Sequence, residues 1–348
     1  MTRARPTVPL EFWVAAYLLL YLPNVMVTRW VTTTPHTALG RPLTGIETLP
    51  ASLIISMVLT YLFIWLSGWY RDSSSIQVAG KRIPFPTRHT FISGIGTALI
   101  LFTVPLSFTI RDVSIPFMQL LMRGDILLIA PVLDFMFGRR VRWWSWVALV
   151  MVLAALVLTL TDRGGFKLPP IAIATIILYT LGYFVRLAVM NRISKTGDPA
   201  SVRRYFVEEK VIALPLSVLA LAVLAVSGIG GPTDELYWGF VGVWTDPVII
   251  DIFFIGLTLT VISVVSIIIL LNPQENAYCV PLERAASLLA GVGGSVLLAL
   301  YWGGEMPREA ELIGAGILIA AIVLLSVAPR LSRPRPVLPQ PTVEEPVA

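Results

Sequence analysis

Long apolar runs separated by short polar segments dominate the chain as far as position 328. A transmembrane helix needs about 20 apolar residues to cross the hydrocarbon layer of a bilayer. Ten runs fit this description, so the pattern predicts ten transmembrane helices. Their expected ranges are 11–28, 49–70, 91–110, 114–138, 143–161, 168–190, 211–227, 248–271, 277–302 and 310–328. Arg3 and Arg5 precede the first run as in a signal peptide, but the run is too long and no small-residue cleavage site follows, so we expect it to remain as an anchor.

Composition narrows the class of protein further. Of the 348 residues, 56% are hydrophobic and 14% are charged, whereas a soluble domain carries about 25% charged residues. A soluble core of this size could not hide so much apolar surface, so we expect lipid to be the solvent. The single cysteine, Cys279, excludes internal disulfides and a cysteine-based metal site. The sequence therefore predicts an all-α integral membrane protein with no metal and no cofactor.

The distribution of basic residues predicts the orientation of the helices, because cytoplasmic loops are enriched in lysine and arginine. With the N-terminus inside the cell, 17 of the 26 basic residues fall in inside segments, 6 in outside segments and 3 within helices. Segment 228–247 carries three acidic residues and no basic one, as expected outside. We therefore expect both termini in the cytoplasm and a disordered, proline-rich tail at 330–348. The basic residues form no stripe typical of nucleic-acid binding.

The excess of arginine over lysine is typical of a GC-rich bacterial genome, so the expected location is a bacterial cell membrane. Two halves of the chain also resemble each other at shifts of about 165 residues. The matched pairs are Pro116/Pro281, Gly138/Gly303, Tyr17/Tyr179 and Tyr21/Tyr183. Because each half holds five helices, an odd number, the second half must be inverted relative to the first. Inverted repeats are the usual architecture of secondary transporters, with the solute site between them. We predict repeats at 1–165 and 166–329.

Two passages of the chain resemble a known family. Segment 116–140, followed by a helix that begins with tryptophan, resembles the passage from the fourth to the fifth helix in the drug/metabolite transporter superfamily, notably in its EamA-like and nucleotide-sugar-transporter-like members. Segments 281–290, 303–307 and 311–316 look like the passage from the ninth to the tenth helix of that superfamily. The resemblance implies a transporter whose ten helices form two inverted repeats.

The chain departs from the pattern of the simplest bacterial exporters at two places. Arg140 stands where the second half has Glu305, although a glutamate often follows the fourth helix in the superfamily. The loop at 228–247 is also longer than in compact bacterial members. Both departures weaken an assignment to those exporters.

Charged and polar residues inside the predicted helices are the candidate functional residues. A charge at the centre of a bilayer costs about 2.5–3.5 kcal/mol on insertion scales, so such residues should face the protein interior. On the fourth predicted helix, Gln119, Arg123 and Asp134 recur at helical spacing and form one polar stripe. On the ninth, Arg284 and Ser287 begin a matching stripe of one cation and small residues. Inversion would place the two arginines on opposite sides of one central cavity.

We predict that Arg123 and Arg284 bind an anionic group of the solute, because arginine stays charged in a poor dielectric and offers a fixed fork of donors. The resemblance implies the same role, since phosphate-translocating members use cations on these two helices. The predicted substrate-binding residues are Arg123, Arg284, Gln119, Arg186, Asn24, Tyr183 and Ser287, where Arg186 and Asn24 match in the repeat. The carboxylates that could couple transport to protons are Asp125, Asp134, Glu283 and Asp251.

A structural interpretation competes with this one. The three arginines within helices could pair with three acids as internal struts, and the charges would balance. Those acids are Asp125, Asp134 and Glu283. The protein would then be a non-transporting membrane scaffold or sensor. We expect instead a secondary transporter, not an enzyme, that moves a small anionic or zwitterionic metabolite by alternating access. Its expected partners are the solute and the lipid bilayer; a homodimer, the direction of transport and the coupling ion stay open.

Overall fold

The computed structural model describes residues 9–36, 40–78, 81–107, 110, 113–122, 124, 143–162, 168–193, 198–227, 233–271 and 276–331. Nearly all of them are helical. The helices are α1 (Leu10–Thr33), α2 (Gly45–Ser67), α3 (Arg88–Ser107), α5 (Trp143–Asp162), α6 (Pro170–Ile193), α7 (Pro199–Ser227), α8 (Thr233–Val241), α9 (Ile249–Leu270), α10 (Asn276–Trp302) and α11 (Glu309–Leu331). Residues 115–122 are also helical. Two short 3₁₀ turns, Trp69–Asp72 and Gly242–Thr245, and a hairpin of β1 (Ser75–Val78) and β2 (Lys81–Pro84) complete the described elements.

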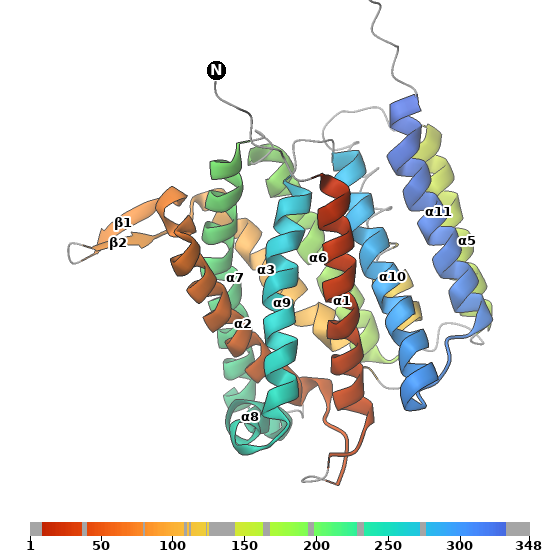
Figure 1. The fold of residues 1–348 in the computed structure, drawn as a ribbon, viewed down its shortest axis with the longest axis horizontal. Coiled ribbons are helices and arrows are strands. Elements are labelled where there is room, and N and C mark those ends of the chain that lie inside the picture. Colours follow the sequence, from red (N-terminus) through yellow and green to blue (C-terminus); the bar gives the residue numbers. More distant parts are fainter. Residues whose placement is uncertain are drawn as a thin grey trace, which may run out of the picture.

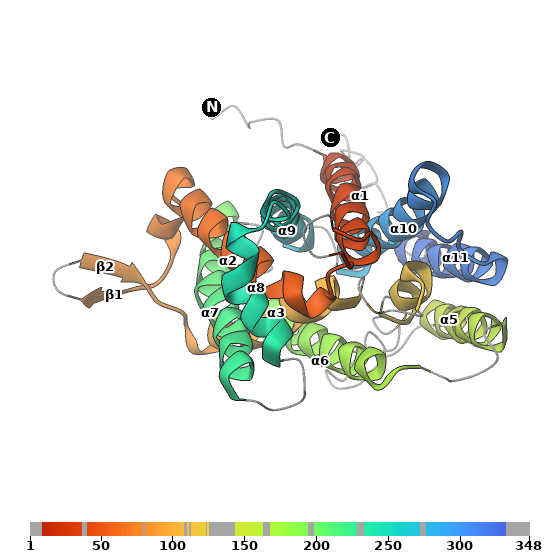
Figure 2. The ribbon, with the colours of Figure 1, turned by 90° about the horizontal axis from the view of Figure 1, so that it is seen from below.

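Seven helices in the described part of the chain are long and apolar enough to cross a membrane, namely α1, α2, α3, α6, α7, α9 and α10. They lie side by side in one bundle, and α5 and α11 form a pair at one edge of it (Figures 1 and 2). Many of the large apolar side chains on the outside of the bundle are exposed, including Leu19, Trp65 and Ile250. A surface of this kind needs lipid around it. The chain is therefore an all-α, multi-pass membrane protein.

A helix occurs within every one of the ten predicted ranges, although the fourth range is described only as far as position 124. The seventh prediction was wrong at its start. Helix α7 begins at Pro199 rather than near 211. The prediction misses its first turns because five charged residues interrupt the apolar pattern there and indicate a loop. Those residues are Arg203, Arg204, Glu208, Glu209 and Lys210. The predicted external loop at 228–247 contains the short helix α8, and residues 332–348 of the predicted tail lie outside the described residues.

Local sequence signals explain how α2 begins and ends. The Thr44 side chain accepts a hydrogen bond from the Glu47 amide at 3.3 Å, and the Glu47 carboxylate accepts one from the Thr44 amide at 2.8 Å. This reciprocal capping satisfies two amides that the first turn of a helix leaves without partners. The helix ends at Gly68, whose φ of 72° favours glycine. Arg41 adds an ion pair with Glu47 at 2.6 Å.

Each helix of the bundle packs against specific neighbours. Helix α3 packs against α6 and α7, and α9 packs against α1 and α2, while α10 packs against α1 and α11. Helices α3 and α6 come close together where Gly96 and Gly182 face each other. A Cβ added to Gly96 would lie 2.7 Å from the carbonyl oxygen of Gly182. Only glycine allows two helix backbones to come this close, as is common inside membranes.

Candidate functional site

Arg284 lies about two turns into α10 and is only 1% exposed. Its guanidinium carbon is 3.6 Å from the centre of the Tyr183 ring and 5.7 Å from that of the Tyr179 ring. Its Nη1 donates a hydrogen bond to the Tyr179 hydroxyl. The two tyrosines lie one turn apart on α6, with ring centres separated by 4.7 Å. The sequence prediction named Arg284 and Tyr183 separately, and the structure brings them together in one cation–π contact.

The acid nearest to Arg284 in sequence points elsewhere. Glu283 accepts a hydrogen bond from the Ser266 hydroxyl of α9 at 2.5 Å. Its other carboxylate oxygen lies 3.9 Å from Nε of Arg284, which is beyond hydrogen-bonding distance. Both residues are 1% exposed. The pair therefore keeps its charges close together without the short, two-pronged contact that arginine makes in a strong ion pair.

The described part of the fourth helix packs directly on α10. A Cβ added to Gly291 would lie 2.9 Å from Cγ of Gln119, so the small residue of α10 receives the glutamine side chain. Gln119 is fully buried. Ser287, also buried, donates a hydrogen bond to the carbonyl oxygen of Arg284 within its own helix at 2.9 Å. Gln119, the described member of the polar stripe predicted on the fourth helix, thus meets α10 at Gly291.

A second buried arginine has a different environment. Arg186 on α6 is 4% exposed and donates to both carboxylate oxygens of Glu209 on α7, from Nε at 2.8 Å and from Nη2 at 3.3 Å. Glu209 also accepts from Thr97 of α3 at 2.6 Å and from the Tyr205 hydroxyl at 3.1 Å. Ser93 of α3 adds a longer contact at 3.4 Å. We call these residues the Glu209 network; it ties α3, α6 and α7 together.

The sequence predicts a cytoplasmic loop at 191–210, but the structure buries two charged residues of this segment. Glu209 is fully buried and Lys210 is 2% exposed. The ammonium of Lys210 lies 5.7 Å from the centre of the Phe206 ring. One signal for the early start of α7 was present: Asp198 followed by Pro199, because aspartate caps helices and proline favours their first turn.

The remaining predicted residues belong to helices α1 and α9 or fall outside the described residues. Asn24 of α1 donates to the carbonyl oxygen of Ile255 at 3.2 Å and to the Thr258 hydroxyl at 2.8 Å, so it links α1 to α9. Asp251 lies in the first turn of α9 and is partly exposed. Arg123, Asp125 and Asp134 fall outside the described residues.

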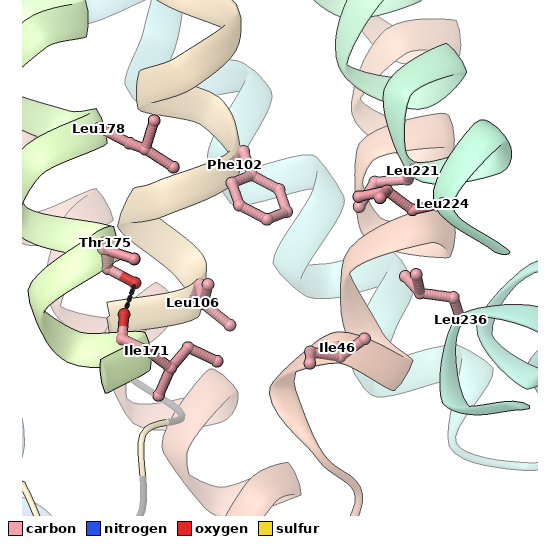
Figure 3. A pocket seen from close by; sticks show the side chains of 10 residues that line it. Ile46, Phe102, Leu106, Ile171, Thr175, Leu178, Leu221, Leu224 and Leu236 are labelled. Atoms are coloured by element: carbon pink, nitrogen blue, oxygen red, sulfur yellow. Dashed lines mark hydrogen bonds between the residues drawn. The ribbon is translucent and has the colours of Figure 1, made fainter. Parts of the chain in front are cut away.

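A separate apolar pocket of about 240 Å³ lies between α3 and α6 on one side and α2, α7 and α8 on the other (Figure 3). Its lining includes Phe102, Leu106, Leu178 and Leu221. The one hydroxyl in the lining, that of Thr175, donates to the carbonyl oxygen of Ile171 at 2.6 Å. Neither Arg186 nor Arg284 lines this pocket, and its described lining is apolar, so its chemistry suits hydrocarbon rather than an anion. No cluster of metal-ligating side chains occurs among the described residues.

Comparison with known proteins adds little to this picture. No family model matches the chain, and no curated protein matches it. A solved crystal structure, described only as that of a protein, is similar over 94% of this chain and 98% of its own, with 14% identity and a TM-score of 0.49. At this level of similarity, the two structures establish neither a shared fold nor a shared function.

Proposed function

We propose that this protein is a secondary transporter that moves a small anionic or zwitterionic metabolite across a cell membrane by alternating access. The observation that carries the proposal is Arg284, a cation buried between membrane helices and held against Tyr183 and Tyr179. Charged residues inside a membrane are costly and tend to line solute pathways. An arginine on an aromatic face keeps its charge, and the planar fork of a guanidinium suits recognition of an oxyanion.

The packing of the helices supports two inverted repeats of five helices, at 1–165 and 166–329. If α1 corresponds to α6, α2 to α7 and α3 to α9, the contacts of α3 with α6 and α7 become the contacts of α9 with α1 and α2, and both sets occur. The buried tyrosine pair Tyr17/Tyr21 on α1 likewise matches Tyr179/Tyr183 on α6. Repeats of this kind place a solute site between the two halves.

The ten-helix count and the cytoplasmic location of both termini are part of the same proposal. They rest on the charge bias of the loops and on the helices α5 and α11 in the expected places. An engineered cysteine at Asp234, in a variant without Cys279, tests the orientation. An impermeant thiol reagent should label it on intact cells; protection there, with labelling of the C-terminal tail, would reverse the topology.

A membrane scaffold or sensor is the second candidate, and the Glu209 network favours it. Arg186 behaves as an internal strut, since both oxygens of a buried carboxylate engage its guanidinium. If Arg284 were also structural, the protein would need no solute. The two candidates therefore differ in what Arg284 binds.

Ligand-induced thermal stabilisation of the purified full-length chain tests the proposal. The panel contains inorganic phosphate, phosphorylated metabolites, carboxylates, neutral sugars and organic cations. We expect one anionic or zwitterionic class to raise the melting temperature, and uptake of the same class by proteoliposomes. Arg284→Gln should abolish that stabilisation at a normal yield of folded protein, whereas Arg186→Gln should lower the yield. Stabilisation without uptake would favour a sensor; normal ligand binding by Arg284→Gln would overturn the anion site.

A further inference from the structure

The β1–β2 hairpin carries three large apolar side chains on one face, all open to the surroundings. Ile76 pairs directly with Ile83 across the two strands, and the amide of Phe85 continues the ladder by donating to the carbonyl oxygen of Ser74 at 2.8 Å. Because side chains alternate along a strand, Ile76, Ile83 and Phe85 share a face while Gln77 lies on the other. Their exposed fractions are 41%, 45% and 50%. We call these three residues the hairpin face.

The base of the hairpin is held firmly on α7 by a buried carboxylate. Glu208 accepts hydrogen bonds from the Ser74 amide at 2.9 Å, from the Thr87 amide at 3.2 Å and from the Thr90 hydroxyl at 2.8 Å. Arg204 adds an ion pair with Glu208 at 2.9 Å. Both strands of the hairpin therefore leave the bundle in a direction that the fold determines.

The hairpin points away from the side of the bundle. Figure 1 shows the hairpin extending across the helix axes from the end of α2, and the view from below confirms that it points away from the bundle (Figure 2). The aromatic residues just before the hairpin indicate its level relative to the bilayer. Trp65 is 64% exposed near the end of α2, and Trp69 and Tyr70 follow. Tryptophan and tyrosine gather at the level of the lipid headgroups, so the hairpin leaves the bundle at that level.

The charge around the hairpin is strongly positive. Residues 71–90 contain four basic residues and one acid. That acid, Asp72, is bound by Arg203 of α7 at 2.5 Å, whereas Arg71 and Arg88 are exposed on either side of the hairpin. Lys81 and Arg82 are the other two basic residues. An apolar face combined with basic residues is the combination by which surface segments bind anionic membranes.

We propose that the hairpin is a membrane-surface anchor: the hairpin face inserts into the boundary between headgroups and acyl chains, and the surrounding basic residues bind anionic lipid headgroups. The partner is the bilayer leaflet at the end of the bundle where α2 ends and α7 begins. The proposal depends on the chain being a membrane protein and is independent of what it transports. Such an anchor would fix the depth of α2 and α7, and with α7 the Glu209 network.

An environment-sensitive fluorophore on single cysteines tests the anchor in the full-length chain with Cys279 replaced by alanine. The label is placed at Ile76 or Ile83, with Gln77 on the opposite face as the matched control. The protein is reconstituted in phosphatidylcholine vesicles with or without phosphatidylglycerol. We expect blue-shifted emission and at least about twofold stronger quenching by spin-labelled lipid at Ile76 and Ile83 than at Gln77. The difference should grow with phosphatidylglycerol, and that growth should be smaller in Arg71→Gln/Arg88→Gln, which keeps Lys81 and Arg82.

Two results would overturn the proposal. Equal, water-like emission at Ile76, Ile83 and Gln77 in both kinds of vesicle would leave the hairpin face in solvent. Blue-shifted emission that persists in detergent and falls on dilution of the protein would assign the face to contact with a second copy of the chain instead of lipid.

Discussion

Arg186 and Arg284 are buried to nearly the same extent, at 4% and 1% exposure, yet their neighbours differ in kind. Arg186 meets a carboxylate that hydroxyls from α3 and α7 also bind. Arg284 meets two tyrosine rings, and the carboxylate of Glu283, its neighbour in sequence, lies 3.9 Å away and accepts from a serine. Burial alone therefore does not separate a strut from a binding residue. The chemistry of the described neighbours differs: two donors of Arg186 go to one carboxylate, whereas the described contacts of Arg284 are with tyrosines.

The largest expected effect comes from breaking the Glu209 network. Glu209→Gln leaves the Arg186 guanidinium buried without its counter-charge, and removal of one partner from a buried pair costs about 3–5 kcal/mol. We expect a sharp fall in folded yield and melting temperature, measured by fluorescence-detected size-exclusion chromatography after heating. Glu309→Gln, at an exposed acid in the first turn of α11, is the matched control and should change little. A folded yield like that of the wild type in Glu209→Gln would remove the distinction between the two arginines.

Glycine substitutions offer a second way to compare the surroundings of Arg186 with those of Arg284. Gly96→Ala would place a Cβ 2.7 Å from the backbone oxygen of Gly182, which cannot move aside, next to the Glu209 network. We expect a loss of about 1–3 kcal/mol, the usual cost of overpacking. Gly291→Ala meets the flexible Gln119 side chain at 2.9 Å and should cost less, and Gly316→Ala, with nothing within 4 Å, is the control. Thermal unfolding of the three variants measures the order; a reversed order would mean that the α10 contact is the more rigid.

The helices were predictable because length and apolar character alone determine what can cross a bilayer. The Glu209 network was not, because its charges reduced the apolar signal at the start of α7 and their partners lie elsewhere in the chain. Arg186 is 23 positions from Glu209, and Thr97 is 112 positions from it. Periodicity can place a charge on a helix face, but only packing reveals which helix that face meets.

The same limit explains which features around Arg284 could be predicted from the sequence and which could not. The spacing of Tyr179 and Tyr183 indicates that both rings lie on one face of α6, and the polar stripe on α10 predicts that Arg284 faces the interior. Their contact could not be read from either pattern alone. Asn24 shows the opposite case: its match with Arg186 predicted a binding role, while its side chain spans the contact between α1 and α9.

A smaller effect is expected at the Arg284 site itself. Tyr183→Leu removes the ring that lies 3.6 Å from the guanidinium carbon. Cation–π contacts contribute about 0.5–2 kcal/mol, so the anion that stabilises the wild type should bind about 2- to 30-fold more weakly. Titration of the melting temperature with that anion measures the change. Tyr183→Phe keeps the ring and should bind as the wild type does. Equal losses in both variants would assign the effect to the hydroxyl and contradict a cation–π role.

The smallest expected effect lies at the start of α7, outside its membrane-spanning segment. The amides of Ala200 and Ser201 donate to the Asp198 carboxylate, each at 3.2 Å. The Ala200 amide is the main cause that holds the pKa of Asp198 below its usual value, and it outweighs the slight desolvation that acts against it. Because the folded pKa is lowered, the carboxylate stabilises the folded state above the pKa of the unfolded chain, and this contribution disappears as pH falls through the folded pKa.

Asp198→Ala should therefore lower the melting temperature slightly at neutral pH, and the difference from the wild type should shrink below about pH 4, where aspartate in an unfolded chain becomes protonated. Asp198→Asn keeps one side-chain oxygen that can accept from the Ala200 or the Ser201 amide, without the charge, so it should retain most of the stability and lose its pH dependence. Melting temperatures of the three proteins across this pH range measure both effects. A deficit in Asp198→Ala that stays constant down to low pH would show that the carboxylate charge contributes nothing to the cap. The start of α7, and with it the placement of Glu209 opposite Arg186, would then depend on the backbone preference of Pro199 instead.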